Sequence, residues 1–191
     1  IIALLFPIGF ALYEFKIAKK VSFLAVFGFV SILLTGGIGL LKLPSEWIAI
    51  KESMIPFTIG MVILVLALSG KSSMKFIISP LLDLDKIESI LIKNKLVDQL
   101  RKILLFASLL LSMSFFVSSM LNYFLARMIV KSPSGTDAFN HELGVLTALS
   151  YPVIAIPSVL VMMLSIWYVV YKLKKLTQLN FMDMLKEEFR Q

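Results

Sequence analysis

Long stretches without a single charged residue limit what this chain can fold into more than any other feature. Four of them have the length of a helix that crosses a bilayer, for which about 20 apolar residues are needed. A fifth, shorter stretch precedes them. We therefore expect an all-α, polytopic transmembrane helical bundle. Its spans are expected approximately at 1–15, 21–41, 53–70, 103–127 and 143–171.

The composition agrees with lipid contact. Of the 191 residues, 59% are hydrophobic and only 16% are charged, whereas a soluble domain carries about 25% charged residues. Segment 1–15 is short for a span. Because the chain does not begin with methionine, we expect residues before this segment and interpret it as part of a span; a re-entrant half-helix is the alternative. In domain terms, 1–172 form the transmembrane bundle and 173–191 a cytoplasmic amphipathic tail.

Basic residues are concentrated in alternate connecting segments. Of the 19 lysines and arginines, 15 lie in segments 16–20, 71–102 and 172–190. The positive-inside rule makes these segments cytoplasmic, which places the C-terminus inside the cell and the N-terminus outside. Because the charge follows the loops and forms no single patch, we expect membrane lipids, and either other membrane proteins or copies of this chain, as partners, and no nucleic acid.

Groups for chemistry are scarce. Without cysteine, disulfides, thiolate nucleophiles and cysteine-based metal sites are excluded. Gly70-Lys71-Ser72 resembles the end of a phosphate-binding loop, but Val65 stands where that loop needs a glycine. Bounding the spans by charges also leaves every ionisable residue at or beyond a span end. Intramembrane ionisable residues are usually functional, so we expect no enzyme, no catalytic residue, no cofactor and no metal ligand.

The loop 71–102 has the pattern of an amphipathic helix. Asp85 and Glu88 have the spacing of a helix N-cap and its partner. Apolar residues then recur at helical spacing: Leu84, Ile87, Ile90, Leu91, Val97 and Leu100. Three uses remain open: a helix on the cytoplasmic membrane surface, an extension of the fourth span packed against neighbouring helices, or a docking helix for a partner.

Two spans carry small or polar residues on one face. In the second span these are Gly28, Ser31, Thr35 and Gly39, a face suited to close helix packing or a partner. In the fourth span the polar face consists of Ser108, Ser112, Ser118, Ser119, Asn122 and Tyr123. This polar face either bonds neighbouring helices together or lines a substrate path.

Prolines and aromatic residues mark further positions. Pro56, Pro152 and Pro157 are expected to break or bend their helices, which can expose carbonyls to ions or substrates. Aromatic side chains at span ends are expected to anchor the protein in the headgroup region: Trp47, Trp167, Tyr168 and Tyr171. Lys51 and Glu52 stand directly before the third span, where the two can pair.

Several apolar motifs resemble a known family. They are Gly37–Leu41, Trp47-Ile48, Ile50–Ser53, Gly70–Ser72, Phe76-Ile77, Ser114–Phe116, Leu121–Phe124 and Tyr168–Tyr171. Together they are similar to the intracellular septation protein A family and its uncharacterised relatives in bacterial inner membranes. The loop 71–102 and the C-terminal tail depart from the shorter septation proteins. The resemblance implies a multi-pass bacterial inner-membrane protein of envelope upkeep, with no catalytic residues to carry over.

Together these features predict a non-enzymatic integral protein of the bacterial inner membrane. Its expected role is that of an accessory or structural component of a cell-envelope or lipid-handling membrane assembly. The alternative is a small transporter or channel that uses the Ser/Asn-lined face of the fourth span and the proline-broken last span.

Overall fold

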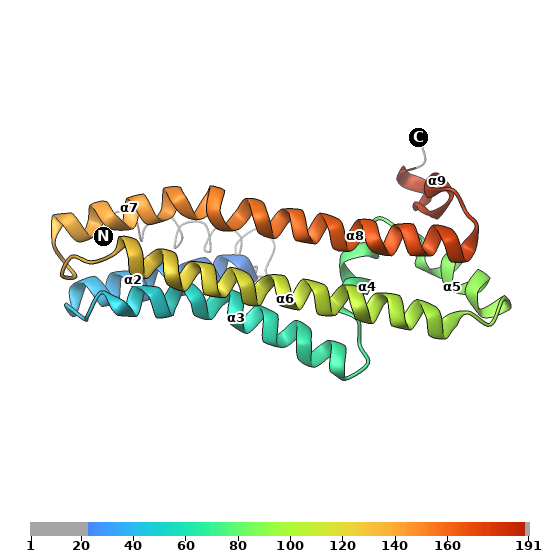
Figure 1. The fold of residues 1–191 in the computed structure, drawn as a ribbon, viewed down its shortest axis with the longest axis horizontal. Coiled ribbons are helices and arrows are strands. Elements are labelled where there is room, and N and C mark those ends of the chain that lie inside the picture. Colours follow the sequence, from blue (N-terminus) through green and yellow to red (C-terminus); the bar gives the residue numbers. More distant parts are fainter. Residues whose placement is uncertain (1–22, 190–191) are drawn as a thin grey trace, which may run out of the picture. The chain divides into compact units, whose positions relative to one another are not determined.

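The computed structural model describes residues 23–189, and side chains from residue 30 onward (Figure 1). The expected span 1–15 lies outside these residues. The helices are α2 (Phe23–Leu40), α3 (Glu46–Leu68), α4 (Ser73–Ile78), α5 (Leu84–Lys93), α6 (Val97–Ile129), α7 (Asp137–Ser150), η1 (Tyr151–Ala155), α8 (Ile156–Thr177), α9 (Phe181–Met184) and η2 (Glu187–Phe189). The described part contains no strand, only an isolated bridge between Leu82 and Leu185, so it is helical as predicted.

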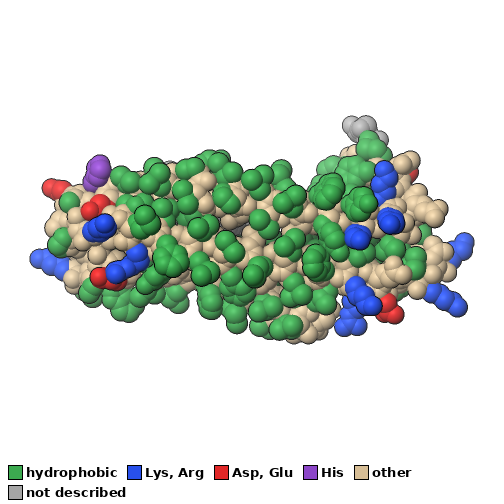
Figure 2. Space-filling model, in the orientation of Figure 1, with side chains coloured by type: hydrophobic (Ala, Val, Ile, Leu, Met, Phe, Trp, Pro, Cys, Tyr) green, Lys and Arg blue, Asp and Glu red, His purple; other side chains and the backbone are tan. Residues whose placement is uncertain are grey.

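Three helices of the described part are long and apolar enough to cross a membrane. They are Glu46–Leu68, Val97–Ile129 and the continuous helix Asp137–Thr177 formed by α7, η1 and α8. The apolar part of α2 with described side chains, Val30–Leu40, is shorter. Figure 2 shows hydrophobic side chains over much of the visible helix surface. Length, composition and exposed apolar surface are compatible with an integral membrane protein.

Helix α3, which carries the expected span 53–70, starts earlier than the charge pattern indicated. The amides of Trp47 and Ile48 already donate to the carbonyls of Pro44 and Ser45, at 3.1 and 3.0 Å. The helix therefore begins at Glu46 and includes Lys51 instead of starting after it. A charged residue can lie within an apolar helix when its side chain finds partners inside the protein.

The chain divides into two compact units, each with its own core. Unit 1 contains the chain up to Ser53 and Asn122–Ser150. Its core forms around Ile48 of α3 and Phe139 of α7, both almost completely buried. Unit 2 contains Met54–Leu121 and Tyr151–Gln191, and its core combines residues of α3, α4, α5, α6, α8 and the C-terminal segment.

The segment 71–102 contains two short helices and the beginning of α6, not one amphipathic helix. Asp83, not Asp85, is the N-cap of α5, because the Asp83 carboxylate accepts the amide of Lys86 at 3.1 Å. Ile87 and Leu91 are 0% exposed in the core of unit 2. This burial supports the alternative in which the apolar stripe packs against other parts of the chain.

The C-terminal segment after α8 covers α5. The backbone of Met184 accepts the amide of Asp83 at 2.9 Å, and the amide of Lys186 donates to Leu81 at 3.1 Å. Met184 is buried in the same core as Leu91. Figure 1 shows this segment folding back at the end of α8, where Leu185 forms an isolated bridge with Leu82. The predicted tail is thus partly the end of α8, to Thr177, and partly a segment folded onto the protein.

Candidate functional site

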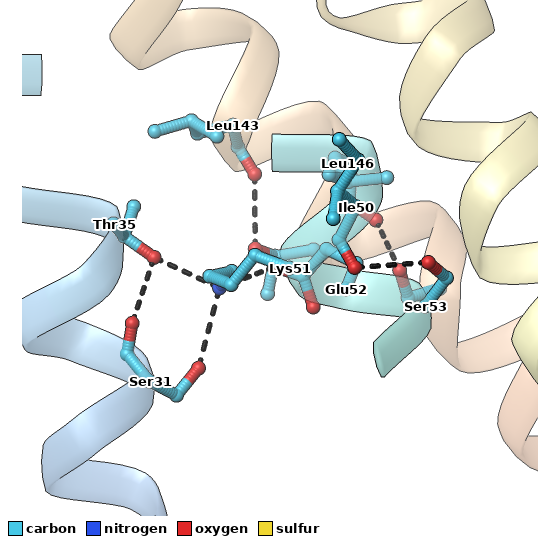
Figure 3. Close-up of polar contacts among 10 residues, drawn as sticks. Ser31, Thr35, Ile50, Lys51, Glu52, Ser53, Leu143 and Leu146 are labelled. Carbon is cyan, nitrogen blue, oxygen red and sulfur yellow. Dashed lines mark hydrogen bonds and ion pairs between the residues drawn. The ribbon is translucent and has the colours of Figure 1, made fainter. Parts of the chain in front are cut away.

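Lys51 of α3 lies inside unit 1, with its side chain only 8% exposed (Figure 3). Its ammonium nitrogen donates to the hydroxyls of Ser31 and Thr35 in α2, at 3.2 and 2.8 Å. It also pairs with the carboxylate of Glu52 at 2.7 Å. A lysine has three N–H donors, and each has an acceptor here. We call Ser31, Thr35, Lys51 and Glu52 the Lys51 cluster.

The Lys51 cluster changes two sequence-based interpretations. The pairing of Lys51 with Glu52 is confirmed. The helix that carries the expected third span begins before Lys51, so Lys51 lies within the apolar helix α3, where it is buried. Because its donors are satisfied within the protein, the arrangement joins α2 to α3 by charge-assisted hydrogen bonds.

The small face predicted for α2 has two kinds of contact. Ser31 and Thr35 bind Lys51, and the Thr35 hydroxyl also donates to the Ser31 carbonyl at 3.0 Å. Gly39 lies near the ring of Phe139, which a Cβ built on Gly39 would meet at 3.9 Å. Gly28 lies in α2. This face of α2 thus combines hydrogen bonding, at Ser31 and Thr35, with close packing, at Gly39.

Part of the predicted polar face of α6 is used inside unit 2. Ser108 and Ser112 are buried. The Ser112 hydroxyl donates to the carbonyl of Gly60 in α3 at 2.8 Å, and the Ser108 hydroxyl accepts the amide of Met74 at 3.1 Å. These two serines therefore attach α6 to α3 and α4. Ser118 and Ser119 are also buried.

The other end of this face belongs to unit 1. Tyr123 is exposed, and its ring packs edge-on against Phe124 at 5.7 Å. Asn122 is half-buried.

The predicted proline sites have different local structures. Pro56 lies inside α3, which continues to Leu68. Pro152 lies in the π-helical turn η1, and Pro157 is in the first turn of α8. A cavity of about 180 Å³ is lined by Pro157 and Ser158 of α8 and by Ser114 and Ser118 of α6.

The aromatic anchors are mostly exposed, as residues at a membrane interface are. Trp47 of α3 is exposed. Trp167 and Tyr171 are exposed on α8 and stack at 5.6 Å. Tyr168 instead packs against Phe106 of α6, with ring centroids 5.2 Å apart, and lies under the ammonium of Lys172.

A larger cavity in unit 2 combines cationic and apolar side chains. It has a volume of about 590 Å³ between the end of α3, α4, α5 and the first half of α6. Its cations are Lys71, Lys75 and Arg101, and its one acid is Glu88. Its apolar lining includes Leu68 and residues of α4, α5 and α6. We call it the basic pocket.

The turn after α3, at Gly70 and Lys71, forms one wall of the basic pocket, and its hydrogen bonds explain its conformation. Gly70 has φ +77°, and the amides of Gly70 and Lys71 donate to the carbonyls of Ala67 and Leu66, at 3.0 and 2.9 Å. This is the Schellman ending of a helix, which favours glycine at the left-handed position. A Cβ on Gly70 would also lie 2.7 Å from a guanidinium nitrogen of Arg101.

Ser72 attaches this turn to α6. Its hydroxyl lies 3.0 Å from the Ser108 hydroxyl and 3.2 Å from the Leu104 carbonyl. Lys75 of α4 then pairs with Glu88 of α5 at 2.6 Å. The sequence-based prediction included Ser108 but missed the pocket, because its walls come from segments that only tertiary folding brings together.

The described residues contain no group of three or more histidine, aspartate and glutamate side chains able to hold a metal ion. His141 is exposed in α7. No family model, curated protein or solved structure matches this chain.

Proposed function

We propose that this chain is a non-enzymatic, multi-pass protein of a bacterial inner membrane. In this proposal it serves as an accessory or structural component of a cell-envelope or lipid-handling assembly, and it is related to the septation protein A family. The C-terminus and segment 71–102 face the cytoplasm, and the N-terminus faces the periplasm. The apolar helices support the membrane location, and the excess of lysine and arginine in segment 71–102 supports the orientation.

The accessory role is supported by the way in which the polar side chains are used: they bond helices of this chain to one another. Ser108 and Ser112 of α6 and the ammonium of Lys51 are hydrogen-bonded to other helices within their units. Large apolar side chains, in contrast, remain exposed on α3, α6 and α8, among them Phe57, Met113 and Leu164. Polar groups that bond helices together and apolar faces that contact lipid or other helices suit a structural component.

Co-purification tests this role. The chain, carrying a tag, is extracted in a mild detergent from cells that express it at native level, and its partners are identified by mass spectrometry. We expect a different membrane protein at a fixed ratio, lost when apolar Met113 and Leu164 are replaced by alanine. An unrelated tagged multi-pass protein is the control. Recovery of this chain alone contradicts the accessory role.

The runner-up is a small transporter or channel. One observation favours it: the cavity of about 180 Å³ where Ser114 and Ser118 of α6 meet Pro157 of α8. A protein that uses this cavity should release or exchange solute from liposomes. Flux should fall when Ser118 is replaced by leucine, and also when Asn122 is replaced by leucine. Equal flux with and without the protein excludes this function.

The orientation has a test of its own. Single cysteines introduced at the exposed positions Lys93 and Ala138 are labelled in intact cells with a maleimide that does not cross the membrane. The chain has no natural cysteine, so no background labelling is expected from it. Labelling at position 138 and not at position 93 is the expected result, and the reverse pattern contradicts the orientation.

A further inference from the structure

We propose that the basic pocket binds the headgroup of an anionic phospholipid, with the start of an acyl chain along its apolar wall. This inference rests on the membrane location in the proposed function, not on the accessory role. The cavity of about 590 Å³ falls within the size range of sites for small molecules, about 300–1,000 Å³.

The charges of the pocket favour an anion. Lys75 is compensated by Glu88, whose carboxylate lies 2.6 Å from its ammonium nitrogen. Among the described residues, Lys71 and Arg101 have no acidic partner within ion-pair distance. Among the described residues that line the cavity, two cations are therefore uncompensated, and the one carboxylate is already paired. A phosphate diester would supply the missing negative charge.

The local backbone brings one of these cations close to the turn. The guanidinium of Arg101 lies against Gly70, where a Cβ would come within 2.7 Å of its nitrogen. Lys71 follows directly in the chain. The planar guanidinium can bind two phosphate oxygens at once. The Schellman turn thus places Lys71 and Arg101 at the same cavity.

The apolar lining favours a lipid over a free anion. Leu68 and Phe76 line the pocket and are each 74% exposed. Leu68 is the last residue of α3, one of the helices able to cross a membrane. Exposed apolar side chains next to lysine and arginine at a helix end are typical of the headgroup boundary. In Figure 2, lysine and arginine side chains gather over this part of unit 2.

Native mass spectrometry of the purified full chain tests the proposal. The protein in mild detergent receives equal amounts of dioleoyl phosphatidylglycerol and dioleoyl phosphatidylcholine, and the bound lipids are counted. We expect an excess of phosphatidylglycerol that falls about tenfold in Arg101→Gln and in Lys71→Gln, because each loses a charge-assisted hydrogen bond. Lys93→Gln is the matched control. It removes the same charge from α5 outside the pocket and should leave the excess unchanged.

The outcomes separate the alternatives. Equal retention of the two lipids by the parent protein overturns the proposal, as does an unchanged excess in both pocket variants. Glycerol 3-phosphate, which has the anion without the acyl chains, is added as a competitor at the same concentration. It should displace little lipid; full displacement overturns the lipid assignment in favour of a free-anion site. If Arg101→Gln does not elute as a folded protein in gel filtration, Lys71→Gln carries the test.

The experiments test the lipid site and the accessory role independently of each other. Retention of phosphatidylglycerol without a co-purifying protein contradicts only the accessory role. A co-purifying protein without selective lipid retention contradicts only the pocket. Recovery of the chain in the aqueous phase after detergent phase separation contradicts the membrane location on which the lipid site rests.

Discussion

The ammonium nitrogen of Lys51 in α3 lies 2.8 Å from the hydroxyl oxygen of Thr35 in α2. Within unit 1, this bond connects α2 to the first part of α3 through a charge that is almost completely buried. A buried charge is costly when it loses a partner, yet the whole arrangement can often be replaced by apolar residues at little cost. This asymmetry gives the first prediction.

Thr35→Val should destabilise the protein by about 1–3 kcal/mol, because it leaves a donor of Lys51 without its partner. Thr147→Val is the matched control, since the exposed Thr147 hydroxyl bonds only back to Leu143 of its own helix. Lys51→Met should cost less than Thr35→Val. The free energy of unfolding in detergent is measured for all three. Equal losses for Thr35→Val and Thr147→Val would contradict the role of the Lys51 cluster.

Gly60→Ala should destabilise unit 2 by about 1–3 kcal/mol through overpacking. A Cβ on Gly60 would lie 3.2 Å from both the Cβ of Phe115 and the ring of Phe116. Gly36→Ala in α2 is the control, because a Cβ there meets no atom of residues 23–189 within 4 Å. It should be neutral or stabilising by up to about 1 kcal/mol. Thermal unfolding of the two variants compares them, and the same loss in both would rule out overpacking.

Asp83→Ala should destabilise α5 by about 1 kcal/mol, the usual cost of a lost N-cap. Asp85→Ala serves as its control, because Asp85 is exposed one residue inside the helix and does not cap it. Hydrogen exchange of the amides in Leu84–Lys93 should speed up in the first variant and change less in the second. The opposite order would restore Asp85 as the N-cap.

Glu142 gives a pH-dependent prediction. It precedes the uncharged stretch 143–171 that we expect to cross the membrane. The backbone amide of Ser132, then its hydroxyl, and also the amide of Lys131 donate to the Glu142 carboxylate, which lowers its pKa below the ordinary value for glutamate. A lowered pKa stabilises the folded loop above the ordinary glutamate pKa. That stabilisation is lost as the pH falls through the lowered pKa.

Exchange protection of the Lys131 and Ser132 amides, corrected for intrinsic rates, should therefore disappear in acid. The Asn140 amide donates to the Thr136 carbonyl and should stay protected over the same range. Glu142→Gln should weaken protection at positions 131 and 132 and remove its pH dependence. Protection that persists unchanged in acid would contradict this loop structure.

The apolar helices could be predicted from sequence because uncharged length alone indicates a membrane-crossing helix. Their ends could not. Bounding a span by its nearest charge placed Lys51 outside, whereas the hydroxyls of Ser31 and Thr35 make its burial within α3 possible. Nothing in the spacing of Ser31 and Thr35 distinguishes a packing face from a pair of acceptors for a lysine on the next helix.

In the loop 71–102, too, the sequence could not predict features that depend on contacts between distant segments. Asp85 and Asp83 both stand three residues before a suitable amide, and the choice between them depends on a bond from the Asp83 amide to Met184, far along the chain. The basic pocket likewise requires Gly70 to lie beside Arg101. One signal was present: a glycine-lysine pair at the end of an apolar helix, which fits a Schellman ending as well as a phosphate-binding loop.

The contact of Leu185 with Leu82 also constrains the order of events during synthesis. The ribosome makes α5 well before Met184 and Leu185, so the surface that they cover stays open while α6, α7 and α8 are made. Only after these last residues leave the exit tunnel can this part of unit 2 close. A nascent chain stalled before residue 184 would therefore leave Leu82, which is 2% exposed in the folded protein, without its Leu185 partner and open to chaperones and proteases.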